Sequence, residues 1–94
     1  MKIEIYTHTI TKYTTWQEAH DLCQSLGEGW RLPTLMELDY IHKLGKEGKL
    51  ILGNYGCWGE KNDADFAWSK GFHTGNTYLN PLDNRNLLLP VRNI

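Results

Sequence analysis

The first half of the fold is decided by two stretches, TWQEAHDLCQSLG (residues 15–27) and WRLPTLMEL (residues 30–38). In each stretch a threonine is followed three residues later by a glutamate, Thr15 by Glu18 and Thr34 by Glu37. This is the spacing of a capping box, in which the threonine hydroxyl and the glutamate carboxylate each accept a backbone N–H from the other residue. The sequence therefore predicts two helix starts.

Apolar residues at helical spacing follow both starts. From Trp16 they recur along one face of period 3.6, and Gly27 is a residue type that ends helices in the left-handed conformation. We expect one helix over residues 16–26 and a second over residues 35–44. Both are amphipathic, so each must pack its apolar face on another layer.

The remaining chain reads as short strands and turns. Residues 2–6 alternate between polar and apolar types, as a strand does. Further strands are expected at residues 57–60, 65–69, 76–80 and 86–94. The last contains Pro90, which has no N–H for a sheet and therefore indicates either a bulge or an unpaired position there. The predicted fold class is α+β, with two helices packed on an antiparallel sheet, in a single domain over residues 1–94.

The 57–69 hairpin has two faces, and the sequence does not decide which one is exposed. In a strand, Phe66 and Trp68 point to one face and Ala67 to the other. Either face is a candidate for the solvent side, and an outward Phe66–Trp68 pair would form an exposed apolar patch.

The pattern T-W-x-x-A-x-x-x-C followed by W-R-L-P-T-x-x-E-L resembles the opening of C-type lectin-like domains. The resemblance is strongest to the bacterial and phage branch, a domain of unknown function found at the C-terminal end of the Legionella collagen-like adhesin. In that branch an aromatic-Trp-Ser strand and a closing V-R-x-V-R strand follow. Residues 57–59 (CWG) and 89–94 (LPVRNI) stand at those places. The resemblance covers about residues 10–94 and implies a compact lectin-like fold whose terminal strands pair, residues 2–6 with residues 87–94.

Charge and hydropathy argue against two classes of partner. The net charge is −1, and the ten basic and eleven acidic residues are spread along the chain without a basic stripe. We therefore expect no nucleic-acid partner, since phosphate binding relies on clustered Lys and Arg. The sequence shows neither a signal-peptide core nor an apolar run of about 18 residues, so no membrane partner is expected either. The expected location is cytoplasmic, or on a phage particle.

Two cysteines leave a disulfide question open. Extracellular C-type lectin domains usually join the Cys of the first helix to a Cys in the last strand, and this last strand contains none. A bridge between Cys23 and Cys57 stays an alternative, whereas buried free thiols are favoured because Cys on an apolar helical face is commonly a small core residue.

The sequence offers no convergent catalytic or metal-binding motif. The four histidines at positions 8, 20, 42 and 73 show no H-E-x-x-H spacing, and the Glu-Pro-Asn and Trp-Asn-Asp motifs of calcium-dependent sugar binding do not occur. We therefore expect no enzyme activity, no cofactor and no metal site. An enzyme would need an unrecognised site that includes His73, Asp63 or Cys57. For Arg31 two roles remain, a ligand-facing guanidinium or an ion pair with Glu37, and the ion pair is favoured.

The second half of the chain combines aromatic and charged residues on turns beside the sheet, a setting typical of recognition surfaces. The lectin resemblance implies the same half. The candidate ligand- or partner-binding residues are Glu60, Lys61, Phe66, Trp68, Phe72, His73, Tyr78 and Arg85.

The predicted function is a non-enzymatic, calcium-independent binding module that docks a protein partner through this loop-rich half. The alternative is a small intracellular, phage-borne inhibitor or sponge that sequesters a host protein or a small molecule such as a nucleotide signal. The sequence does not give the oligomeric state.

Overall fold

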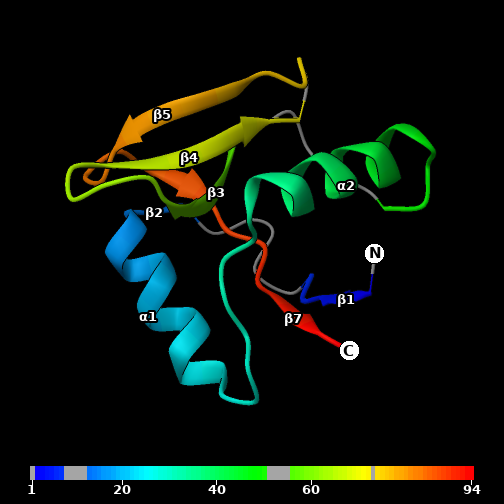
Figure 1. Cartoon of the computed structure of the whole chain (residues 1–94), viewed down its shortest axis with the longest axis horizontal. Helices are drawn as coiled ribbons and strands as arrows, with labels where there is room; N and C mark the ends of the chain where they lie inside the picture. The colour runs from blue at the N-terminus through cyan, green and yellow to red at the C-terminus, as the bar shows by residue number, and fades with distance from the viewer. Residues whose placement is uncertain (1, 8–12, 51–55, 73) are drawn as a thin grey trace.

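In the described part of the chain, two capped helices pack with a five-stranded sheet and a two-stranded sheet (Figure 1). The computed structural model describes residues 2–7, 13–50, 56–72 and 74–94. Helix α1 (Trp16–Leu26) has the predicted bounds and ends at Gly27, whose φ is 67°. Helix α2 (Leu35–Lys46) runs two residues beyond its predicted end. Both capping boxes are confirmed, each with its two reciprocal hydrogen bonds.

Among the described residues, seven strands form two sheets, and the α+β class is confirmed. The strands are β1 (Ile3–Ile5), β2 (Tyr13–Thr14), β3 (Gly56–Lys61), β4 (Phe66–Gly71), β5 (Thr77–Pro81), β6 (Asn86–Leu87) and β7 (Val91–Asn93). The larger sheet has the order β2-β6-β3-β4-β5, and the smaller sheet pairs β1 with β7. All pairings are antiparallel except β3 with β6, which is parallel.

The terminal strands pair as expected, with Glu4 opposite Arg92. Arg92 also holds this end of the molecule together, because it forms ion pairs of 2.8 Å with Glu4 and with Glu28. Its guanidinium lies 4.6 Å from the centre of the Trp30 ring.

The single strand expected over residues 86–94 is wrong. The structure divides it into β6 and β7, which belong to different sheets. Leu88 and Leu89 are fully buried between the two strands, and the Pro90 carbonyl accepts the Tyr6 N–H at 2.8 Å. The chain therefore leaves one sheet and enters the other at the point where proline has no N–H to give to a ladder.

The described core residues form two clusters on opposite faces of the central strands. The α1 cluster contains Trp16, Ala19, Cys23, Leu32, Trp58, Ala67 and Leu88. The α2 cluster contains Leu38, Ile41, Cys57, Leu89 and Val91. Neighbouring residues such as Cys57 and Trp58 enter different clusters because successive side chains of a strand point to opposite faces. The central strands thus separate the two helices.

A β-bulge in β3 joins both helices to the sheet. Trp58 lies opposite Ser69 but Lys61 lies opposite Ala67, so β3 carries one extra residue between these pairs. The bulged Gly59 accepts the Trp16 indole N–H of α1 at 3.0 Å. A Cβ on Gly59 would lie 2.8 Å from a methyl carbon of Leu38 on α2, so only glycine fits this close approach without a shift.

The hairpin of β3 and β4 answers the open question about its faces. Ala67 is buried in the α1 cluster, whereas Phe66 is exposed and Trp68 is half-buried. The face with Phe66 and Trp68 is therefore the wetter one.

Candidate functional site

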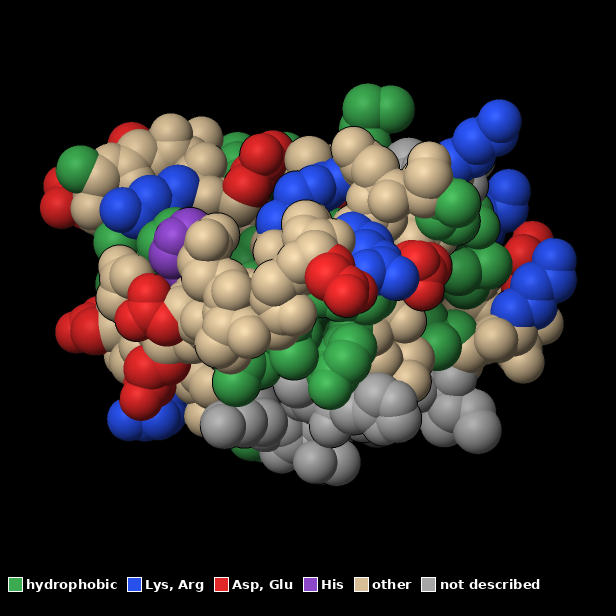
Figure 2. Space-filling view, turned by 90° about the horizontal axis from the view of Figure 1, so that it is seen from below, with side chains coloured by type: hydrophobic (Ala, Val, Ile, Leu, Met, Phe, Trp, Pro, Cys, Tyr) green, Lys and Arg blue, Asp and Glu red, His purple; other side chains and the backbone are tan. Residues whose placement is uncertain are grey.

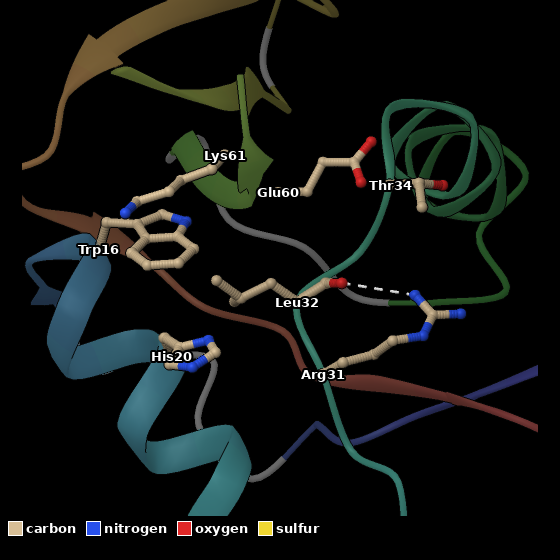
Figure 3. Close-up of a pocket in the computed structure, with 7 residues that line it drawn as sticks. All are labelled: Trp16, His20, Arg31, Leu32, Thr34, Glu60 and Lys61. Atoms are coloured by element: carbon tan, nitrogen blue, oxygen red, sulfur yellow. Dashed lines mark hydrogen bonds between the residues drawn. The ribbon is translucent and has the colours of Figure 1, made fainter. Parts of the chain in front are cut away.

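An open groove of about 320 Å³ lies between α1 and the segment that leads into α2 (Figure 3). It is lined by Trp16, His20, Arg31, Leu32, Thr34, Glu60 and Lys61. The side chains come from α1, from the connection between the helices and from the bulged end of β3. The groove therefore depends on the bulge, which brings Glu60 beside the helix connection through a 3.0 Å bond from its N–H to the Pro33 carbonyl.

One wall of the groove is aromatic. Trp16 and His20 are one helical turn apart on α1, where residues four apart are neighbours. Their rings stack with centroids 5.1 Å apart and an interplanar angle of 14°. The Lys61 ammonium lies 4.9 Å from the centre of the Trp16 ring, a cation–π distance. Since the indole N–H is also bonded to Gly59, this wall is held in place from three directions.

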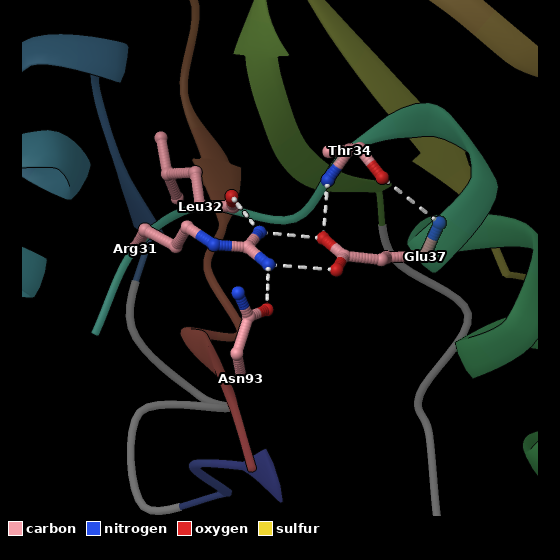
Figure 4. Close-up of polar contacts among 5 residues, drawn as sticks. All are labelled: Arg31, Leu32, Thr34, Glu37 and Asn93. Carbon is pink, nitrogen blue, oxygen red and sulfur yellow. Dashed lines mark hydrogen bonds and ion pairs between the residues drawn. The ribbon is translucent and has the colours of Figure 1, made fainter. Parts of the chain in front are cut away.

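The opposite wall is built on an ion pair (Figure 4). Arg31 donates to both carboxylate oxygens of Glu37, at 2.6 and 2.8 Å, and to the Asn93 side-chain oxygen at 2.7 Å. Glu37 also accepts the Thr34 N–H at 2.8 Å, so one carboxylate serves the helix cap and the guanidinium together. Of the two roles left open for Arg31, the structure shows the ion pair.

The pKa values in this network follow from its hydrogen bonds. The bond from Arg31 holds the pKa of Glu37 below its ordinary value, although burial acts in the opposite direction. The same bond raises the pKa of Arg31, and the charge of Glu60 adds to this effect. Glu37 is therefore ionised and already paired with Arg31. The Glu60 carboxylate is the remaining acidic group on the Arg31 side of the groove.

Leu32 forms the floor between the two walls (Figure 3). Its side chain is 92% removed from solvent and belongs to the α1 cluster, so the floor is rigid and apolar. In Figure 3, Lys61 lies on the side of Trp16, and Glu60 lies on the side of Thr34 and Arg31. The groove thus combines an apolar floor with one basic side and one acidic side.

The predicted site residues occupy several different places. Glu60 and Lys61 line the groove. Phe66 and Trp68 share one face of the sheet, since they lie opposite Pro81 and Leu79 of β5. Tyr78 lies opposite the buried Ser69 and therefore on the other face.

The other candidates are separated further. Phe72 packs against the α2 cluster and stacks on His42, with 6.3 Å between the ring centres. Arg85 lies 3.4 Å from Glu18 at the start of α1. His73 lies outside the described residues. The seven described candidates therefore do not share one surface, because strand alternation separates Tyr78 from Phe66 and Trp68, Phe72 packs on the α2 cluster and Arg85 pairs with Glu18.

Sequence reasoning missed the other lining residues of the groove. Trp16, which begins the predicted apolar face of α1, and Leu32 are both buried in the α1 cluster, yet each also lines the groove. The available signal was the spacing of Trp16 and His20, which places two rings on one helical face beside a connection of seven to eight residues.

Both cysteines are free and buried. Burial raises the pKa of the Cys23 thiol to about 11 and that of the Cys57 thiol to about 12. The alternative of a Cys23–Cys57 bridge is therefore not the state that the structure shows. Because the thiolate is the reactive form, both groups are poor nucleophiles in this fold.

The acidic turn at residues 62–65 has a local role. One Asp63 carboxylate oxygen accepts the N–H groups of Asp65 and Phe66, at 2.9 and 3.0 Å. These bonds, that of Asp65 first, lower the pKa of Asp63. Among the described residues, no three His, Cys, Asp or Glu side chains gather in a group that could hold a metal ion.

Figure 2 shows basic and acidic side chains interspersed over one face, without a large area of a single sign. In the described segments, neither helix has the length and apolar character needed to cross a membrane.

No family model matches the chain, and it matches no curated protein.

Proposed function

We propose that this chain is a non-enzymatic binding module that docks a protein partner in the groove between α1 and the helix connection. The observation that carries the proposal is the preformed groove itself, with an apolar floor and two walls fixed by internal bonds. A rigid site loses little conformational entropy when a partner binds, which favours recognition. Of the candidate residues in the second half of the chain, the proposal retains Glu60 and Lys61 as those that contact the partner.

The lectin-like assignment is part of the same proposal. Paired terminal strands and two helices against a sheet agree with what the resemblance implies. The groove binds its partner without calcium in this proposal, and the setting is the cytoplasm or a phage particle.

The test compares two surface variants in affinity capture. A groove variant carries His20→Ala and Lys61→Glu, and a matched sheet variant carries Phe66→Ser and Leu79→Ser, which remove exposed apolar groups of β4 and β5. We expect the groove variant to lose a stoichiometric protein partner and the sheet variant to retain it. The opposite result would move the docking site to the sheet. Thermal melts of both variants show whether each is folded.

A second candidate function is the sponge for a small molecule. It is favoured by the groove volume of about 320 Å³, since small-molecule pockets commonly span about 300–1,000 Å³. Native mass spectrometry of the purified protein distinguishes the two functions. A reproducible small-molecule mass that disappears in the groove variant supports the sponge, whereas an unliganded mass together with groove-dependent protein capture supports the docking module.

A further inference from the structure

The polar side chains that line the groove are of two kinds. Some already form hydrogen bonds or ion pairs within the protein, and others remain available to a partner. The guanidinium of Arg31 is engaged by Glu37, Asn93 and the Leu32 carbonyl, and the Thr34 hydroxyl accepts the Glu37 N–H. These groups hold the wall in place. A partner must therefore be recognised mainly by the remaining side chains.

The available charges are those of Glu60 and Lys61, both exposed. Within the segments that the structure describes, neither side chain forms an ion pair. Lys61 rests over the Trp16 ring, a contact that leaves its three N–H groups free to donate. The Glu60 carboxylate is free to accept from a cation.

These two charges face different parts of the groove (Figure 3). On one side of the groove the charges of Arg31 and Glu37 cancel as an ion pair. The net charge on that side is therefore negative because of Glu60. On the other side Lys61 provides a positive charge beside the Trp16–His20 stack. Between them lies the apolar surface of Leu32. Charge complementarity of this kind selects a partner and fixes its orientation.

From this arrangement we infer that the groove recognises a short segment of a protein in which one apolar residue is flanked by an acidic and a basic residue. The apolar side chain lies on Leu32, the partner's carboxylate pairs with Lys61 and the partner's cation pairs with Glu60. This inference rests on the docking function proposed above and specifies the chemistry of its partner.

The experiment uses three short peptides whose binding to the isotope-labelled full chain is followed by NMR. The probes are acetyl-Gly-Glu-Leu-Arg-Gly-amide and two versions in which either the Glu or the Arg is replaced by Gln. We expect the peptide with both charges to bind about threefold more tightly than either singly charged peptide, since exposed ion pairs contribute modestly. The shifted resonances should be those of the groove residues.

Variants of the protein assign each charge to its partner. Lys61→Ala should remove the advantage given by the peptide's Glu and leave that of its Arg, whereas Glu60→Ala should do the reverse. This crossed pattern does not depend on the direction in which the peptide lies. Lys43→Ala, which removes an exposed lysine of α2 outside the groove, is the matched control and should change neither advantage.

Three results would overturn the inference. The first is peptide binding in the groove without dependence on either charge, which would leave the docking function standing. The second is the absence of groove shifts with all three peptides, in which case the capture experiment alone decides the docking function. The third is binding of free leucine, a zwitterion with the same chemistry, as tightly as the doubly charged peptide, which would assign the groove to a small molecule.

Discussion

The two helix starts share one sequence motif and lie in different surroundings. At α1, the Thr15 N–H reaches the Glu18 carboxylate at 2.9 Å, and at α2 the Thr34 N–H reaches Glu37 at 2.8 Å. The reciprocal bonds to the threonine hydroxyls measure 3.3 and 3.2 Å. The local geometry of the two capping boxes is therefore nearly the same.

The surroundings differ in exposure and in the paired cation. The Glu18 side chain is 56% exposed and its contact with Arg85 measures 3.4 Å. The Glu37 side chain is 10% exposed and receives two short bonds from Arg31. A motif read from the sequence thus locates a helix start, while the tertiary environment sets how much stability the carboxylate contributes.

The largest expected effect is that of Glu37→Ala. The change removes one partner of a bidentate pair and a cap bond at once, and it leaves Arg31 without its counter-charge. We expect a loss of about 2–3 kcal/mol in the free energy of unfolding, somewhat below the range for fully buried pairs because Arg31 is partly exposed. The matched change Glu18→Ala should cost about 0.5–1 kcal/mol. Urea unfolding followed by tryptophan fluorescence measures both, and equal losses would contradict the comparison.

An intermediate effect is expected on acidification. The pKa of Glu37 is lowered in the folded state, chiefly by Arg31, so the unfolded chain takes up this proton first as the pH falls. Stability from the pair is therefore complete above the ordinary glutamate pKa of about 4.3 and is lost as the pH falls through the lower folded value. Glu37→Gln should be less stable than the wild type at pH 7, and the difference should shrink below about pH 4. A difference that grows on acidification would refute this sign.

The smallest expected effect is that of Arg85→Ala. Its contact with Glu18 is long and both side chains are more than half exposed. The loss of stability should lie within about 0.5 kcal/mol, as for most surface pairs. Asn93→Ala is the contrasting change, because it removes a 2.7 Å bond to Arg31 beside the Glu37 pair, and we expect it to cost about 1 kcal/mol. Denaturant midpoints of the two variants measured side by side test this order.

Local sequence rules predicted the elements that depend on neighbouring residues. The boxes at Thr15 and Thr34 act over three residues, and Gly27 ends α1 by its own backbone freedom, so α1 was predicted with its correct bounds. The hairpin of β3 and β4 was also predicted from its turn residues, within about two residues.

Features that depend on distant contacts could not be predicted in this way. The division of the last strand reflects pairing with distant strands, because β6 pairs with β2 and β3 whereas β7 pairs with β1. The bulge at Gly59 is set by close approach of Leu38 and by the Trp16 hydrogen bond. The groove depends on the bulge, which lies between Trp58 and Lys61, and its lining residues come from three separate segments. The sequence named Glu60 and Lys61 but not the ring stack beside them.

The two buried thiols give each layer of the core its own chemical reporter. Cys23 belongs to the α1 cluster and Cys57 to the α2 cluster, and each is 1% exposed. An alkylating reagent can reach either sulfur only when the surrounding layer opens, as in hydrogen exchange. The alkylation rates of Cys23 and Cys57 therefore report separately on the two clusters. Their ratio would show whether the α1 and α2 clusters open together or one before the other.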